Sequence, residues 1–200
     1  MTKSYKQKGY CVSGLTLSGE WVRLVTSPGH ENAVSKAVMD LYPCLDVISV
    51  NLLKHIPLGC QTENYLINEH EKIEIVQRGV DIRCLLQTPY MSNNRYIFGN
   101  SENFLAENFA MKYPNSLMLV QVTDLRFTFV RDEKTAKYKF RCSFKYKGNV
   151  YEKMRITDPV YCNEVHNNEC LKNAAIVVSL PSQPYVNGEF YKFVAKIFPL

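Results

Sequence analysis

The most regular pattern of apolar and polar positions lies between 137 and 147. Apolar side chains take every second position, and basic side chains take nearly all the positions between them. The apolar set is Tyr138, Phe140, Cys142, Phe144 and Tyr146, and the polar set is Lys137, Lys139, Arg141, Ser143, Lys145 and Lys147. An alternation of period two predicts a β-strand with one face in the core and the other in solvent.

Two more strands are predicted beside this one. The apolar run 125–130 precedes it across a polar loop, and Gly148-Asn149 supplies the turn into a third strand at 150–157. We therefore expect a three-stranded meander with an aromatic inner face and a basic outer face. The flanking strands add Arg126, Lys153 and Arg155 to the outer face, and Tyr151 has the same parity as the last two.

Shorter patterns predict the remaining elements. Apolar runs predict strands at 10–15, 20–25, 45–53, 117–122, 174–180 and 191–198, with one short strand each within 60–68 and 71–86. Apolar residues at helical spacing predict two short helices, at 31–42 and 101–111, and a proline follows each of them.

This count of about ten strands and two short helices predicts an all-β fold. The strands fall into two groups, each with one helix, which is typical of two tandem five-stranded barrels of the oligonucleotide/oligosaccharide-binding (OB) type packed together. Pro114 and a change of pattern place the predicted boundary between residues 1–115 and 116–200. One larger β-barrel with helical insertions is the alternative.

Charge is concentrated in the predicted meander. Residues 125–157 hold ten Lys or Arg and three Asp or Glu, whereas the whole chain of 200 residues has a net charge of only +5. A cationic sheet face is suited to a nucleic-acid backbone. The alternative is a solvated surface whose lysines discourage edge pairing. The candidate nucleic-acid-binding residues are Arg126, Lys137, Lys139, Arg141, Lys145, Lys147, Tyr151, Lys153 and Arg155.

The cysteines and the apolar runs limit the class of protein. Seven cysteines occur without a Cys-x-x-Cys pair, and Cys11, Cys84 and Cys142 lie inside apolar patterns. They indicate small buried side chains in a reducing cytoplasm, with no metal site and no cofactor. No apolar run is long enough to span a membrane, and residues 1–8 are too polar for a secretory signal.

Two other features have two interpretations each. Trp21, the single tryptophan, is either a core side chain, which we favour, or a stacking platform for a ligand. The polar loop 60–68 either binds a ligand or is hydrogen-bonding scaffold that ties two sheets together, and we favour scaffold.

Several separated stretches together resemble one family from end to end of the chain. They are Lys3–Lys6, Gly9–Gly14, Gly19–Val25 with its Gly-x-Trp-x-Arg turn, Gln61–Asn68, Ile156–Pro159, Val178–Leu180 and Tyr191–Ile197. The chain resembles the dual OB-fold domain of bacterial proteins, although Thr62 stands where that family usually has proline. The resemblance implies a fold more than an activity. The matched polar positions, a shared site or a shared scaffold, are Lys3, Lys6, Arg23, Glu63, Asn64, Thr157, Asp158 and Lys192.

Three hypotheses for function follow. The first is a non-catalytic module that binds single-stranded DNA or RNA through the basic sheet face. The second is a protein-interaction or sensor module that pairs with a partner at an exposed strand edge, 191–198. The third is an enzyme acting on nucleotides or nucleic acid, but no catalytic motif spacing occurs and no catalytic residue is assigned. The acids and bases considered are Asp46, Glu63, Asp124, Asp158, His55, His70 and His166.

Overall fold

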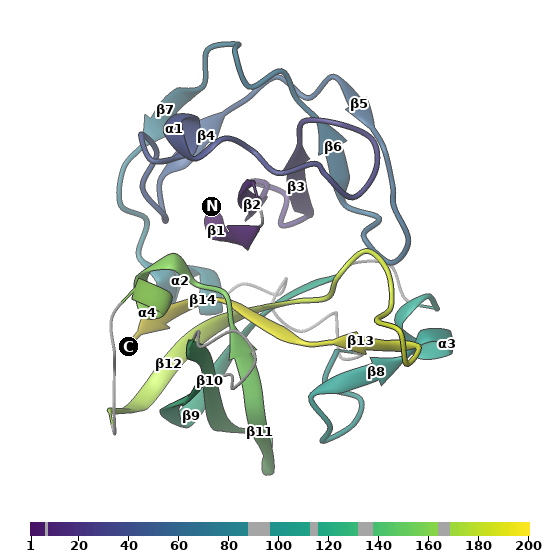
Figure 1. Cartoon of the computed structure of the whole chain (residues 1–200). Coiled ribbons are helices and arrows are strands. Elements are labelled where there is room, and N and C mark those ends of the chain that lie inside the picture. The colour runs from purple at the N-terminus through teal and green to yellow at the C-terminus, as the bar shows by residue number, and fades with distance from the viewer. Residues whose placement is uncertain (7, 88–96, 113–115, 132–137, 164–168) are drawn as a thin grey trace.

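The computed structural model describes residues 1–6, 8–87, 97–112, 116–131, 138–163 and 169–200. Within these residues the chain forms two five-stranded units, one above the other in Figure 1, together with four short helices. The predicted all-β fold with two five-stranded units is confirmed, and the alternative of one larger barrel is wrong. The predicted boundary at Pro114 falls outside the described residues.

The N-terminal unit is a five-stranded sheet with a small second sheet beside it. Its strands are β1 (Thr2–Lys6), β2 (Gly9–Leu15), β3 (Trp21–Val25), β5 (Lys54–His55) and β6 (Asn64–Leu66), in the order β1-β2-β3-β6-β5. The small sheet pairs β4 (Val47–Ser49) with β7 (Glu74–Gln77), and the helix of this unit is α1 (Lys36–Met39). The helix α2 (Ile82–Leu86) follows and packs on the C-terminal unit, where Ile82 clusters with Leu117 and Leu119.

The C-terminal unit is a closed barrel. Its strands are β9 (Leu117–Arg131), β10 (Tyr138–Tyr146), β11 (Asn149–Ile156), β12 (Cys170–Ser179) and β14 (Phe193–Pro199), in the order β10-β11-β14-β12-β9. The helix α4 (Pro159–Asn163) follows β11. Beside the barrel, β8 (Phe104–Ala106) pairs with β13 (Glu189–Tyr191), and α3 (Glu107–Ala110) follows β8.

The two units share one topology. In each, the third strand pairs with the fifth in parallel, as β3 with β6 and β11 with β14, while the other neighbours along the main sheet are antiparallel. In each, a short helix lies between the third and fourth strands. This repeated five-stranded pattern is the architecture expected of OB barrels.

The described residues form three apolar clusters that hold the molecule together. One fills the C-terminal barrel, and a smaller one, around Val12, Val34 and Met39, fills the N-terminal unit. The third lies between the units, where Trp21 and Leu15 pack on the outer surface of the C-terminal barrel. Trp21 is thus a packing residue, as we favoured.

A bulge in β11 changes the predicted face of Tyr151. Cys142 pairs with Met154 and Phe144 pairs with Tyr151, so β11 has one more residue than β10 between these pairs. Lys153, with a φ of 56°, accommodates the bulge. As a result Tyr151 turns into the core and stacks on Phe144, with ring centroids 5.6 Å apart. The prediction that Tyr151 lies on the basic face is wrong.

Both predicted helices are shorter than expected, because some residues of each segment form β-pairing instead of helix. Residue Val34 exchanges backbone hydrogen bonds with Tyr10, so α1 begins only at Lys36. In the second segment Phe104–Ala106 pair with β13, so only Glu107–Ala110 are helical. The segment before Gln87, where the sequence predicted no helix, contains α2, capped by Asp81 Oδ1, which accepts from Arg83 N at 2.9 Å.

Two other expectations from the sequence also change. The proposed free edge at 191–198 is not available, because β14 pairs with β11 on one side and β12 on the other. Among the cysteines, all of which are free thiols, Cys142 is buried as predicted, but Cys84 is exposed and Cys11 is partly exposed.

A buried ion pair links the two units. Arg23 Nε and Nη2 donate to Glu63 Oε1 at 3.1 and 2.9 Å within the N-terminal unit. Arg23 Nη2 also donates to Ser116 Oγ at 2.6 Å and to Ser179 Oγ at 3.3 Å in the C-terminal barrel. Glu63 in turn accepts from the hydroxyl and the backbone N–H of Ser116.

We predict that Glu63→Ala destabilises the protein by about 3–5 kcal/mol, because it leaves the Arg23 guanidinium buried without its counter-charge. Urea unfolding measures the loss. The matched control is Glu74→Ala, which removes an exposed carboxylate paired with Lys72 and is expected to leave the midpoint unchanged. Equal effects of the two substitutions would contradict the prediction.

Candidate functional site

The basic residues predicted from the sequence lie on the outer face of β9, β10 and β11. The exposed ones are Arg126, Lys139, Lys145, Lys147, Lys153 and Arg155, while Arg141 is half-buried. Lys137 lies outside the described residues. The face combines three neighbouring strands of the barrel because the period-two alternation directs its polar set outward.

The centre of this face is organised around Arg141 and Lys153. Arg141 lies opposite Arg155 in the β10–β11 register, and its Nη1 donates to the Lys153 carbonyl at 2.6 Å. Lys153 N donates to Ser143 Oγ at 3.3 Å, and Ser143 lies opposite Arg126 on β9. The bulge therefore aligns cations from all three strands across the middle of the sheet.

The hairpin end of the same face is less available for a ligand. Lys145 Nζ lies 2.8 Å from the Asp124 carboxylate, and this hydrogen bond lowers the pKa of Asp124. Lys147 sits in the turn, with its ammonium 5.4 Å from the centre of the Tyr146 ring. Part of the positive charge is thus balanced locally at this end.

A row of aromatic side chains, not predicted from the sequence, begins beside Arg155. The Arg155 guanidinium lies 5.9 Å from the Phe193 ring, its register partner on β14. From Phe193 the row continues to Tyr185 at 6.5 Å, to Tyr191 at 5.1 Å from Tyr185, and to Phe104 at 6.1 Å from Tyr191. Tyr185 is 47% exposed, and the other three are partly exposed. We call these four residues the aromatic row.

The aromatic row escaped sequence reasoning because its members come from distant segments. Tyr185 lies in the loop between β12 and β13, Phe193 begins β14, and Phe104 comes from before the barrel. The only local signal was the pair of tyrosines flanking Asn187-Gly188.

Five of the eight matched polar positions of the family resemblance are buried, whereas Lys3, Lys6 and Thr157 are partly exposed. Arg23, Glu63, Asn64, Asp158 and Lys192 are each 3% exposed or less. Arg23 and Glu63 form the link between the units, and Asn64 pairs with Arg23 along β3 and β6. Its Oδ1 has no hydrogen-bond partner within the described part of the chain. A ligand on the basic face would not contact these five side chains.

Asp158 fastens α4 to the barrel. Its carboxylate accepts from Lys196 Nζ at 3.0 Å, from Ile197 N at 2.9 Å and from Val160 N at 3.1 Å. The first two bonds join the end of β11 to the middle of β14, and the third ties the start of α4 to Asp158. Next to it, the Thr157 carbonyl accepts from Tyr5 N at 2.7 Å, so β1 of the first unit meets the barrel here.

Lys192 fastens the segment 98–103 beneath the aromatic row. Its ammonium donates to Asn100 Oδ1 at 2.6 Å, to Asn100 O at 3.3 Å and to Glu102 O at 2.7 Å. The rings of Phe98 and Tyr151 lie 5.6 and 5.5 Å from it. Burial lowers the pKa of Lys192 to about 7, and the Glu102 carboxylate opposes this only in part.

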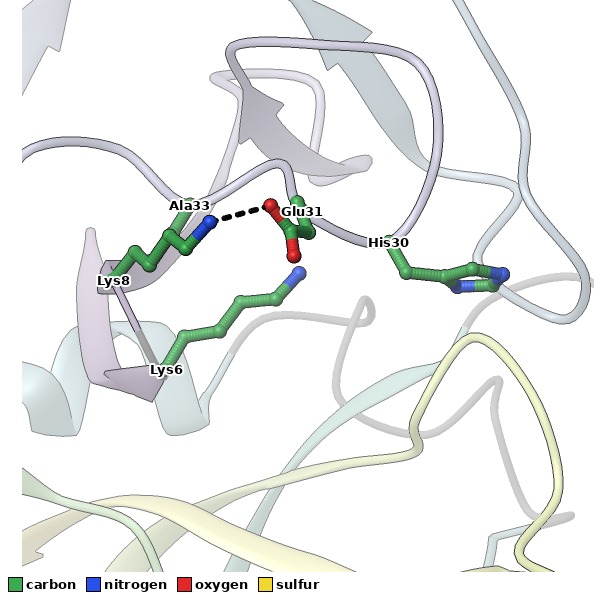
Figure 2. A pocket seen from close by; sticks show the side chains of 5 residues that line it. All are labelled: Lys6, Lys8, His30, Glu31 and Ala33. Atoms are coloured by element: carbon green, nitrogen blue, oxygen red, sulfur yellow. Dashed lines mark hydrogen bonds and ion pairs between the residues drawn. The ribbon is translucent and has the colours of Figure 1, made fainter.

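A shallow pocket of about 150 Å³ lies on the N-terminal unit, lined by Lys6, Lys8, His30, Glu31 and Ala33. Figure 2 shows Lys8 reaching Glu31, where the ion pair measures 2.6 Å, while His30 points away from both. Lys6 donates to Asn32 Oδ1, and burial lowers the pKa of Lys6. The charged side chains that line the pocket therefore already have hydrogen-bond or ion-pair partners within the protein.

The acidic side chains considered as catalytic candidates each pair with a different basic residue: Asp46 with Arg78, Glu63 with Arg23, Asp124 with Lys145 and Asp158 with Lys196. No three His, Cys, Asp or Glu side chains converge among the described residues. His55 Nε2 lies 2.6 Å from the Thr62 carbonyl, and His166 lies outside the described residues. None of the described helices is long and apolar enough to cross a membrane.

Comparison with known proteins agrees with the geometry. The model of one family, described as the dual OB-containing domain, matches residues 1–197. No curated protein and no solved structure matches the chain.

We predict that Lys192 makes the stability of the protein rise with pH above about 7. The pKa of Lys192 is lower in the folded protein than its ordinary value of 10.5, so the unfolded chain holds more protons between these values. Urea unfolding from pH 7 to pH 9 should show this rise in the wild type and a flatter profile in Lys192→Met. The exposed-lysine control Lys54→Met should follow the wild type, and parallel profiles for all three proteins would refute the prediction.

Proposed function

The chain belongs to the family of dual OB-containing domains, and on this premise we propose that it binds single-stranded DNA or RNA without catalysing a reaction. In this proposal the nucleic acid lies across the outer face of β10 and β11 and continues onto the aromatic row. Arg126, Arg141, Lys153 and Arg155 contact its phosphates, and Tyr185 and Phe193 stack on its bases.

The observation that carries this proposal is the contact between Arg155 and Phe193. It joins an exposed cationic sheet face to the aromatic row, in which Tyr185 is exposed and the other three rings are partly exposed. OB barrels bind oligonucleotides on their second and third strands and on the loops beside them. In the C-terminal barrel those strands are β10 and β11, and the loop between the fourth and fifth strands carries Tyr185.

The combination of groups favours a single strand over a duplex. Unpaired bases present flat faces that stack on aromatic side chains, and each stack contributes about 1–3 kcal/mol whatever the base. A duplex hides those faces. Cations spaced along neighbouring strands neutralise the backbone and add affinity that depends on salt.

The first test removes two central cations. We expect Lys153→Ala/Arg155→Ala to weaken binding to a labelled oligonucleotide and to reduce the magnitude of the slope of log K against log[salt] by about 1.4, since about 0.7 of the slope comes from each phosphate contact. Fluorescence anisotropy at several salt concentrations, with DNA and with RNA, measures both effects.

The control for this test is Lys54→Ala/Arg83→Ala, which removes the same charge from exposed positions on the N-terminal side of the chain. Its salt slope should match the wild type. Wild-type protein that binds neither DNA nor RNA would reject the proposal. Equal slopes for the two double variants would remove the basic face from it.

The second test removes a stacking surface. Tyr185→Ala should weaken binding by about fivefold or more through the loss of one base–aromatic stack, while the salt slope stays as in the wild type. Phe109→Ala, which truncates a similarly exposed ring on α3, serves as the control. The aromatic row would be excluded from the site if both variants bound as the wild type does.

A further inference from the structure

The N-terminal unit has no free counterpart of the proposed binding face. Its second and third strands are β2 and β3, and their inward residues, such as Val12 and Leu24, fill its core. The outward residues of these strands pack against the C-terminal barrel instead. Leu15 and its register partner Trp21 join the apolar cluster between the units, together with Leu117 and Val177 from the barrel surface.

The polar outward residues of the same strands are also used. Arg23 is 2% exposed, with its guanidinium bonded to Ser116 and Ser179 of the C-terminal barrel and to Cys11 of β2. The surface of β2 and β3 on which an OB barrel would bind single-stranded nucleic acid is therefore covered by the other barrel.

The N-terminal unit also holds the loop that follows β12. Gln61 Nε2 donates to the Leu180 carbonyl at 2.9 Å, and Cys60 Sγ donates to the Pro181 carbonyl at 3.0 Å. His30 Nδ1 lies 2.8 Å from Ser182 Oγ. The first unit thus holds three successive residues of the loop, Leu180, Pro181 and Ser182, and Ser182 lies three positions before Tyr185.

The contact between Gly59 and this loop is especially close. A Cβ atom at Gly59 would lie 2.0 Å from the Ser182 carbonyl oxygen, which is far inside van der Waals contact. Only glycine permits this approach, because it has no Cβ atom. Gly59 also has a φ of +57°, a backbone conformation that glycine adopts without strain. The loop position therefore depends on a specific residue of the N-terminal unit.

We propose that the N-terminal unit binds no nucleic acid through its own strands and instead braces the 180–188 loop of the C-terminal barrel, so that each chain binds one strand. This inference rests on the proposed function. Gly59, Gln61 and His30 are positioning residues that keep Tyr185 in line with Phe193 and Arg155. The bound length is that of one OB barrel, on the order of 4–16 nucleotides.

The test compares Gly59→Ala with Gly79→Ala. Both glycines have a positive φ, 57° and 62°, but a Cβ at Gly79 meets nothing within 4 Å. The two substitutions thus share the backbone strain, and only the first displaces the loop. Anisotropy with the same oligonucleotide should show affinity about fivefold or more lower for Gly59→Ala than for Gly79→Ala, with equal salt slopes because the phosphate contacts are retained.

A second pair of variants covers the case in which Gly59→Ala does not fold. His30→Ala removes the bond to Ser182 from an exposed position, and His70→Ala is the exposed control. His30→Ala should also bind more weakly than its control with an unchanged salt slope. Isothermal titration of the wild type should give one oligonucleotide per chain.

The outcomes separate this inference from the proposed function. A wild type that binds no strand rejects both. A wild type that binds two strands per chain, or variants that bind as tightly as their controls, overturns the bracing role while leaving the basic face and aromatic row in place.

Discussion

The arrangement of the molecule depends on the buried ion pair of Arg23 and Glu63. Removing both charges from water is costly, and the cost is offset by the direct bonds between Arg23 and Glu63 together with those that Ser116 and Ser179 add from the other barrel. Apolar packing around Trp21 supplies the attraction between the units but tolerates sliding. The directional bonds of the ion pair select one orientation, and that orientation covers β2 and β3 while leaving β10 and β11 exposed.

The strands were predictable where a local pattern determined them. The alternation around Phe140 and Phe144 identified β10 and its basic face, because such a pattern satisfies only a half-buried strand. The helix expected at 31–42 was mostly wrong, because Val34 bonds to Tyr10 across more than twenty residues, and a helical spacing of apolar residues does not reveal that competition. Tertiary pairing outweighed local preference there.

The candidate site likewise has one part that the sequence predicted and one part that it did not. Its cations were predictable because they share one strand pattern, whereas the aromatic row depends on pairing between residues as distant as Arg155 and Phe193. Tyr151 was misplaced by a single extra residue, since a bulge reverses the parity on which a face assignment rests. Five of the eight matched polar positions proved to be buried, and Arg23 and Glu63 among them bond across the two units, which composition alone does not reveal.

The pairing of β8 with β13 joins parts of the chain that a linear division would separate. Leu105 and Ala110 precede the C-terminal barrel in sequence, yet they belong to its apolar cluster. Lys192, directly before β14 of the barrel, also donates to the carbonyl of Glu102, just before them. A fragment starting after these residues would have an incomplete core. The folded unit that contains the C-terminal barrel therefore includes β8 and α3 as well as the strands from β9 onward.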